Sequence, residues 1–228
     1  MIVDVVIPAY NEEQSVGLVV KDILGQRVRN VVVVNNNSRD QTAQVAANAG
    51  AIVLNQSIQG YGAACLMGIE HINGLNIPPD VVLFMDADHS DFAEEIPQVL
   101  KPILDGNFDL VIGSRALGNR EKGSMTMPQI FGNWLATTLI RLIYRYRFTD
   151  LGPFRAILRT KLNELGMVDQ NYGWTVEMQI KALKKKLRCT EVPVNYRQRI
   201  GVSKVSGTVK GTILAGHKIL TTIFKYSL

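Results

Sequence analysis

A run of apolar residues that ends in two carboxylates constrains the fold of this chain more than any other stretch. Residues 81–85 are all apolar, and Asp86-Ala87-Asp88 follows at once. Such a run is typical of a strand that is buried on both faces of a parallel sheet. Ligands of open α/β sheets bind at the carboxyl ends of the strands, where paired carboxylates suit a divalent cation that carries phosphates. A solvated turn after the strand would explain the same pair of carboxylates, so the neighbouring sequence must distinguish a turn from a metal site.

Strands and helices alternate through the first half of the chain. Short apolar runs at 2–8, 31–34, 51–54 and 110–112 are each followed or preceded by a helical pattern. This alternation predicts a doubly wound, mostly parallel α/β sheet.

The pattern changes after Arg115. Helical patterns are expected near 129–146 and 174–186, and a strand near 188–194. No Gly-, Ser- or Pro-rich linker separates these segments, so we expect one domain over 1–207, with halves at 1–115 and 116–207. Residues 208–228 are expected to form an additional amphipathic helix.

The charge of the chain is concentrated at its C-terminal end. The 228 residues carry a net charge of +5, and residues 195–228 contain six basic and no acidic side chains. This asymmetry indicates an anionic partner for that segment. A hydrophobic content of 46% excludes a disordered chain. Two distant cysteines are expected to be buried thiols. The sequence shows no signal peptide and no apolar run long enough to span a membrane.

Polar clusters follow four of the predicted strands, at residues 10–12, 35–40, 86–88 and 114–115. Because the carboxyl ends of parallel strands lie along one edge of a sheet, the four clusters are expected to converge. Convergence of this kind predicts a nucleotide pocket with a metal site at Asp86 and Asp88.

The sequence resembles a known family in these same clusters. Its first half resembles family 2 glycosyltransferases at residues 5–12, 35–38, 60–64, 85–88 and 113–115. Its second half is similar to the branch that contains dolichyl-phosphate mannose and dolichyl-phosphate glucose synthases, at residues 150–156, 174–179, 191–194 and 199–204. The resemblance covers nearly the whole chain and implies a GT-A fold, a nucleotide-sugar donor, a divalent metal (Mg or Mn) and inversion at the anomeric carbon.

The resemblance implies that residues 1–115 bind the nucleotide sugar. Asp88, with Asp86 beside it, would hold the metal at the donor diphosphate and would act in catalysis. The remaining donor-binding residues of this half are expected to be Pro8, Tyr10, Glu12, Asn35, Gly60 and Gly62. Asn35 departs from the family, which usually has Asp there, so the choice between uracil and guanine stays open. The two glycines suit either a loop near the sugar or simple packing at a helix start.

The acceptor half, residues 116–207, and its flanks supply further expected site residues. Arg115 would bind an acceptor phosphate, and the donor diphosphate would be clamped by Arg199, Ser203 and Lys204. Glu177 is expected to act either as a general base or to orient Arg155 or the acceptor. An acceptor phosphate is already an anion and needs no such base.

We therefore expect an inverting, metal-dependent transfer of glucose or mannose to a polyprenyl or dolichyl phosphate. The alternatives are a soluble or saccharide hydroxyl acceptor, a sugar nucleotidyltransferase and a non-catalytic nucleotide-sugar-binding protein. A nucleotidyltransferase needs a Gly-rich loop after the first strand, where this chain has Pro-Ala-Tyr-Asn-Glu.

The C-terminal helix is expected to lie on a membrane. Its apolar face comprises Val209, Ile213, Gly216, Leu220, Ile223 and Phe224, with lysines between them. The expected location is cytoplasmic, with peripheral contact at the cytoplasmic membrane face. Packing of this face on the domain or in a homo-oligomer is the alternative, and no nucleic-acid partner is expected.

Overall fold

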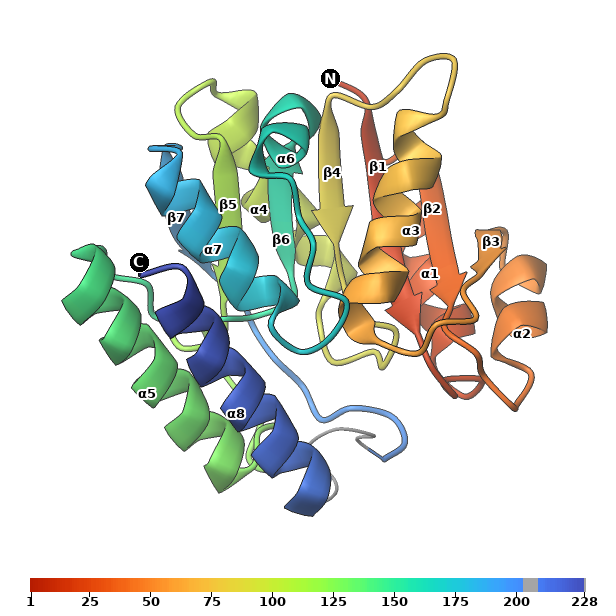
Figure 1. Cartoon of the computed structure of the whole chain (residues 1–228). Coiled ribbons are helices and arrows are strands. Elements are labelled where there is room, and N and C mark those ends of the chain that lie inside the picture. Colours follow the sequence, from red (N-terminus) through yellow and green to blue (C-terminus); the bar gives the residue numbers. More distant parts are fainter. Residues whose placement is uncertain (203–208, 228) are drawn as a thin grey trace.

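The computed structural model of the chain describes residues 1–202 and 209–227 and contains a seven-stranded sheet (Figure 1). The strand order is β3-β2-β1-β4-β6-β5-β7. The strands are β1 (Val3–Ala9), β2 (Asn30–Asn35), β3 (Ile52–Asn55), β4 (Val81–Phe84), β5 (Leu110–Ser114), β6 (Arg155–Leu158) and β7 (Cys189–Pro193). The described helices are α1 (Val16–Leu24), α2 (Thr42–Asn48), α3 (Tyr61–Asn73), the 3-10 helix η1 (Ala93–Glu95), α4 (Ile96–Leu104), α5 (Met127–Tyr144), α6 (Arg159–Leu165), α7 (Trp174–Lys184) and α8 (Val209–Lys225).

The doubly wound, mostly parallel sheet expected from the sequence is confirmed. The parallel pairs β1–β2, β1–β4, β2–β3 and β5–β7 place the ends of these strands along common edges. The exception is β6, which lies between β4 and β5 and is antiparallel to both. The segment that precedes β6 therefore reaches the same edge as the segments that follow β4 and β5.

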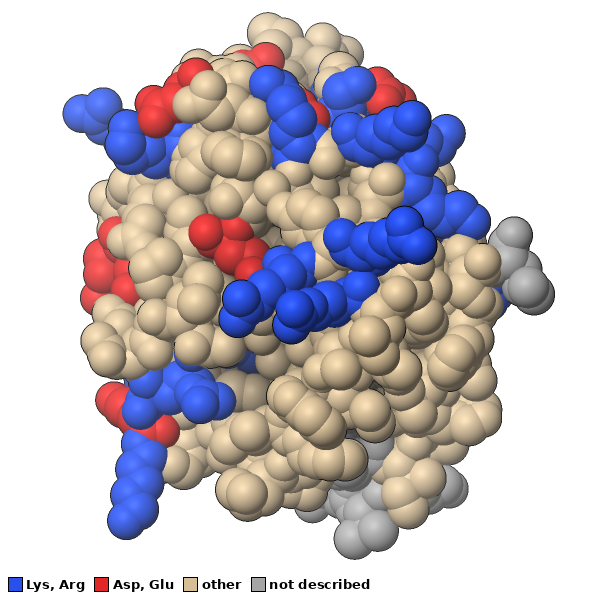
Figure 2. Space-filling model, turned by 90° about the vertical axis from the view of Figure 1, so that its left-hand side faces the viewer, with Lys and Arg blue, Asp and Glu red and all other residues tan. Residues whose placement is uncertain are grey.

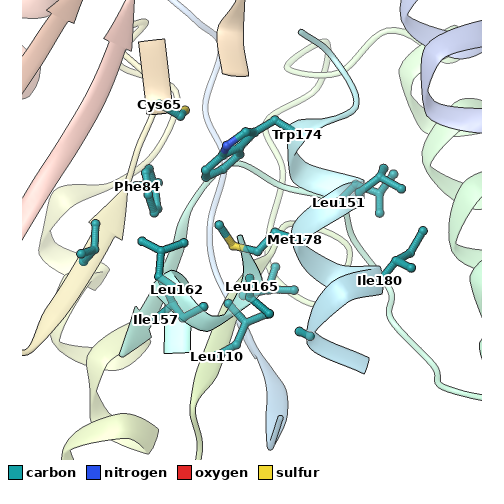
Figure 3. Close-up of a cluster of buried hydrophobic side chains, with 14 of the residues drawn as sticks. Cys65, Phe84, Leu110, Leu151, Ile157, Leu162, Leu165, Trp174, Met178 and Ile180 are labelled. Carbon is teal, nitrogen blue, oxygen red and sulfur yellow. The ribbon is translucent and has the colours of Figure 1, made fainter. Parts of the chain in front are cut away.

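Side chains of the central strands alternate between two apolar cores, one on each face of the sheet. Val6 and Phe84 belong to the core that is covered by α3, α5, α6, α7 and α8, whereas Val5 and Leu83 belong to the core under α1 and α4. Figure 3 shows the first core, in which Trp174 of α7 lies beside Phe84, with ring centroids 4.7 Å apart. Burial on both faces explains why these strands are continuous apolar runs.

Helices α5 and α8 run side by side at one margin of the molecule (Figure 1). The apolar face expected for α8 is divided by this packing. Ile223 is fully buried in the core, whereas Ile213 and Phe224 are 65% and 52% exposed. One part of the predicted membrane face therefore packs on the domain. Within the described part of the chain, no helix is both long and apolar enough to cross a membrane.

Candidate active site

A cavity of about 530 Å³, the edge cavity, lies where β1 and β4 end. It is lined by seven of the residues expected at the site, namely Pro8, Tyr10, Glu12, Gly60, Asp86, Asp88 and Arg199. Pro8 lies at the end of β1, Gly60 caps the start of α3, and Tyr10, Glu12, Asp86 and Asp88 follow β1 or β4, all at the carboxyl edge of the sheet. The structure thus brings residues that are up to 191 positions apart into one hollow.

Arg199 connects the carboxylates on two sides of the edge cavity. Its Nη2 lies 2.6 Å from Oε1 of Glu12, and its Nη1 lies 3.1 Å from Oδ2 of Asp88. Glu12 and Asp88 are both nearly buried, so a nearby cation offsets the cost of removing their charges from water. Among residues 1–202 and 209–227, no group accepts a hydrogen bond from the buried Nε of Arg199.

Asp86 is buried in surroundings that disfavour its charged form. Its Oδ1 accepts a hydrogen bond from the Tyr61 hydroxyl at 3.2 Å. Burial, followed by repulsion from Asp88, raises the pKa of Asp86 to about 7, although Arg199 and the Tyr61 hydrogen bond act in the opposite direction. A cation bound beside Asp86 would relieve both penalties.

The donor atoms around Asp86 and Asp88 fit the divalent metal that the resemblance implies. Both side chains present carboxylate oxygens, the ligands that Mg²⁺ and Mn²⁺ prefer. No group of three or more metal-binding side chains occurs among residues 1–202 and 209–227. A metal held here would thus take its other ligands from phosphates and water, which is the usual arrangement for Mg²⁺.

A second hollow of about 310 Å³, the helix cavity, continues from the edge cavity towards α5 and α8. The two cavities share Asp86, Asp88 and Arg199. The helix cavity is otherwise lined largely by apolar groups, among them Pro128, Leu151, Pro153, Ala215, Gly216 and Ile219. It therefore joins a charged end at the aspartates to an apolar end between two helices.

Arg115 lies at the charged end of the helix cavity. Asp150 holds it firmly: Arg115 Nε donates to Oδ2 at 2.8 Å and Nη2 donates to Oδ1 at 2.7 Å. This pairing lowers the pKa of Asp150 despite burial. Arg115 also lies 5.0 Å from the ring centroid of Tyr196. Asp150 thus fixes the guanidinium of Arg115 at the charged end of the helix cavity.

Two of the expected donor-site residues, Asn35 and Gly62, lie away from the edge and helix cavities. Asn35 donates to Oδ1 of Asn55 at 2.9 Å and does not line either cavity. Gly62 permits packing, since a Cβ there would lie 2.0 Å from the carbonyl oxygen of Asp169. Gly60 shares this packing role, with the Gln170 carbonyl oxygen 2.1 Å from its Cβ position, but it also lines the edge cavity.

Glu177 is the expected catalytic residue that the structure does not bring to the site. Its carboxylate is fully buried and accepts hydrogen bonds from the backbone N–H groups of Val168 and Asp169. Tyr226 donates to it at 2.7 Å, and Lys181 pairs with it at 2.7 Å. Through these contacts Glu177 forms a junction between α7 and Tyr226, which directly follows α8. The expected clamp residues Ser203 and Lys204 lie outside the described residues.

Sequence reasoning missed several groups at the site. Asn36, rather than Asn35, lines the edge cavity, where its Oδ1 accepts from Gly60 N at 2.7 Å. Tyr61 borders both cavities, and its place directly after Gly60 was the available signal. Asp91 is buried near the aspartate pair with no partner for either oxygen among the described residues. Burial and the charges of Asp86 and Asp88 raise its pKa well above the ordinary value.

Comparison with known proteins agrees with this geometry. Residues 4–166 match the profile described as "Glycosyl transferase family 2". An uncharacterised glycosyltransferase of Mycobacterium tuberculosis is 36% identical over 217 residues, which cover 93% of this chain and 94% of the relative. A Haloferax volcanii protein named dolichyl-phosphate hexose transferase is 32% identical over 218 residues, which cover 92% of this chain and 89% of that protein.

Solved structures confirm the GT-A fold. A glucosyl-3-phosphoglycerate synthase from Mycobacterium tuberculosis, in complex with Mn²⁺, UDP and glucosyl-3-phosphoglycerate, superposes with a TM-score of 0.78. The match covers 99% of this chain and 80% of that chain at 19% sequence identity. The same enzyme in complex with Mg²⁺ and UDP gives a TM-score of 0.76 at 20% identity, covering 99% of this chain and 79% of that one. The sequence motifs, the site geometry and the matched profile lead to one conclusion: the chain belongs to glycosyl transferase family 2.

Proposed function

We propose that this glycosyltransferase transfers a hexose from a nucleoside-diphosphate sugar to a polyprenyl phosphate, with inversion at the anomeric carbon. The helix cavity carries this proposal, because it begins at Arg115 and the aspartate pair and continues along apolar groups of α5 and α8. A polyprenyl phosphate has a charged end and an apolar end that match the two ends of this cavity. The relative named dolichyl-phosphate hexose transferase supports the same acceptor.

The edge cavity is the proposed donor site. Asp86 and Asp88 would hold a divalent metal, which supplies positive charge to the diphosphate that leaves. Arg199 is in reach of the same diphosphate, because its guanidinium already lies within 3.1 Å of Asp88. Pro8 and Tyr10 provide a surface for the base and ribose on the other side of the cavity.

The proposed reaction needs no carboxylate base. A polyprenyl phosphate oxygen is already an anion, so it can attack the anomeric carbon without losing a proton. The new bond joins that oxygen to the anomeric carbon, while the bond from the anomeric carbon to the diphosphate breaks and its electrons remain on the leaving group. Arg115 would hold the attacking phosphate on the side opposite the diphosphate. Full burial of Glu177 is consistent with this reaction.

A soluble acceptor is the second candidate function. The solved glucosyl-3-phosphoglycerate synthase shares the fold and is described with a small phosphorylated compound. Arg115 is equally suited to the anionic group of such a compound. The apolar lining contributed by α5 and α8 distinguishes the two candidates, since a small polar acceptor gains little from it.

Product analysis can test the proposal directly. The protein is incubated with Mn²⁺, a radiolabelled UDP- or GDP-hexose and either a polyprenyl phosphate or 3-phosphoglycerate. Transfer of label to the organic phase is expected only with polyprenyl phosphate. Arg115→Gln should suppress this transfer strongly, whereas Arg145→Gln, which alters an arginine outside both cavities, should not. Label transferred only to 3-phosphoglycerate would overturn the lipid-phosphate acceptor.

A further inference from the structure

A third cavity of about 330 Å³, the arginine cavity, lies on another side of α5. Three arginines line it, Arg120, Arg141 and Arg147, together with Trp134 and Thr138. Trp134, Thr138 and Arg141 share one face of α5 because they are spaced by three or four residues along the helix. The arginines come from three different segments, so the fold brings their charges together.

The arginine cavity and the helix cavity are distinct hollows with two lining residues in common. Met125 and Asn133 border both of them. The Nδ2 of Asn133 donates to the Thr149 carbonyl at 2.9 Å, and its Oδ1 accepts from the Leu151 N–H at 2.9 Å. These two bonds hold the segment before β6 against α5. A ligand of the arginine cavity would therefore lie beside the acceptor path rather than in it.

The positive charge of the arginine cavity is not neutralised by neighbouring acids. Within the described ranges, no carboxylate lies within ion-pair distance of Arg120, Arg141 or Arg147. Asp150 borders the cavity, but both of its oxygens are bonded to Arg115. The nearby Glu191 accepts from the backbone N–H groups of Thr149 and Asp150. The arginines thus remain available for an external anion.

Exposed apolar side chains flank the arginine cavity. Trp134 is 58% exposed and Leu142, next to Arg141, is 71% exposed. Phe131 is 60% exposed and lies 5.7 Å from Trp134 between ring centroids. Figure 2 shows this side of the molecule, where basic side chains gather above a broad uncharged surface. Arginine and tryptophan next to exposed apolar groups suit the boundary between phospholipid headgroups and acyl chains.

We propose that the arginine cavity binds a phosphate group, as a monoester or diester, at a site distinct from the donor and acceptor sites. Guanidinium groups bind phosphate oxygens through paired N–H donors, and the Thr138 hydroxyl adds a further donor. Phospholipid headgroups and small phosphorylated compounds share this chemistry. The apolar rim favours the headgroup, which would hold α5 and the mouth of the helix cavity at a lipid surface.

Tryptophan fluorescence offers a direct measurement of occupancy. The chain has two tryptophans; Trp134 lines the arginine cavity, whereas Trp174 is fully buried. Quenching by acrylamide, which is uncharged, will therefore report mainly on Trp134. The titrants are inorganic phosphate, vesicles of phosphatidylcholine alone and vesicles that also contain phosphatidylglycerol. Stronger protection of Trp134 is expected from phosphatidylglycerol vesicles than from phosphatidylcholine vesicles, because the choline cation compensates the phosphate charge of the latter.

Two variants distinguish binding in the arginine cavity from non-specific attraction by surface charge. Arg141→Gln combined with Arg147→Gln should weaken protection by about tenfold or more, since two charge-assisted contacts are lost. Arg145→Gln removes one positive charge, one helical turn from Arg141 and outside the cavity, and should retain most of the protection. Both variants should bind UDP with Mn²⁺ as the parent does, which also verifies that they are folded.

Each of the other outcomes supports or overturns the proposed phosphate site. Protection by inorganic phosphate without any effect of vesicles would support a phosphate site and assign it to small phosphorylated compounds. Equal loss in the Arg145→Gln variant and the double variant would overturn the site in favour of non-specific charge attraction. Absence of protection by both phosphate and phosphatidylglycerol vesicles would overturn it altogether.

Discussion

Proton competition at Asp86 gives a sharp prediction for metal binding. In the metal-free protein, burial and the neighbouring Asp88 raise the pKa of Asp86 to about 7. A divalent cation needs the ionised carboxylate, so protons and metal compete for this group. Mn²⁺ should therefore bind more tightly as the pH rises through 7, and the affinity should level off above that value.

The size of the effect follows from the raised pKa. One pH unit below the pKa of Asp86, about one molecule in ten carries the ionised carboxylate. The apparent Kd for Mn²⁺ at pH 6 should therefore be about tenfold higher than on the plateau, and one proton should be released for each Mn²⁺ bound. Electron paramagnetic resonance of free Mn²⁺ can measure this Kd between pH 5.5 and 8.

Two variants identify the group that titrates. Asp86→Asn should bind Mn²⁺ weakly and without the change near pH 7. His89→Asn removes the nearby imidazole, which contacts Asp22 at 2.8 Å, and should retain the pH dependence. Asn suits position 89, where φ is 63°. A Kd that stays constant across this pH range, or the same slope in Asp86→Asn, would refute the reasoning.

Further perturbations test other parts of the site and the fold. Asp88→Ala should abolish Mn²⁺-dependent binding of UDP in titration calorimetry, and unchanged affinity would remove Asp88 from the site. Arg199→Gln should weaken the same binding by about 1.5–3 kcal/mol if its contact with the diphosphate is desolvated; an unaltered Kd would contradict that contact. Gly62→Ala should lower the Tm in calorimetry, because the added Cβ would lie 2.0 Å from the Asp169 carbonyl oxygen, and an unchanged Tm would refute this packing. Ile213→Ser and Leu214→Ser, at positions 65% and 51% exposed, should reduce sedimentation with anionic vesicles at low salt while the Tm stays constant; equal sedimentation would count against a membrane role for α8.

Apolar runs and the topology of a parallel sheet were sufficient to predict which strand ends lie together. Apolar runs identified β1, β2 and β4, and the parallel topology then required Tyr10, Glu12 and Asp88 to share one edge. Asn35 illustrates the limit of this prediction. Successive residues of a strand point to opposite sides, so the sequence alone does not decide whether Asn35 or Asn36 faces the cavity.

Features that depend on contacts between residues far apart in the chain could not be predicted from the sequence alone. The antiparallel insertion of β6 between β4 and β5 depends on pairing between residues far apart in the chain. Full burial of Glu177 depends on α8, which lies much later in the sequence. A carboxylate beside motifs shared with the family resembles a catalytic group until the surrounding packing is known.

The junction at Glu177 has a consequence for folding during synthesis. The Tyr226 hydroxyl that donates to Glu177 belongs to a residue 49 positions later in the chain. A ribosome will therefore have made α7 well before this partner exists, and burying a carboxylate that lacks one of its donors costs free energy. We expect the α7 region to remain incompletely packed on the nascent chain until α8 has emerged. The strand ends that carry Tyr10, Glu12, Asp86 and Asp88 are made earlier, whereas Arg199 of the same cavity follows later.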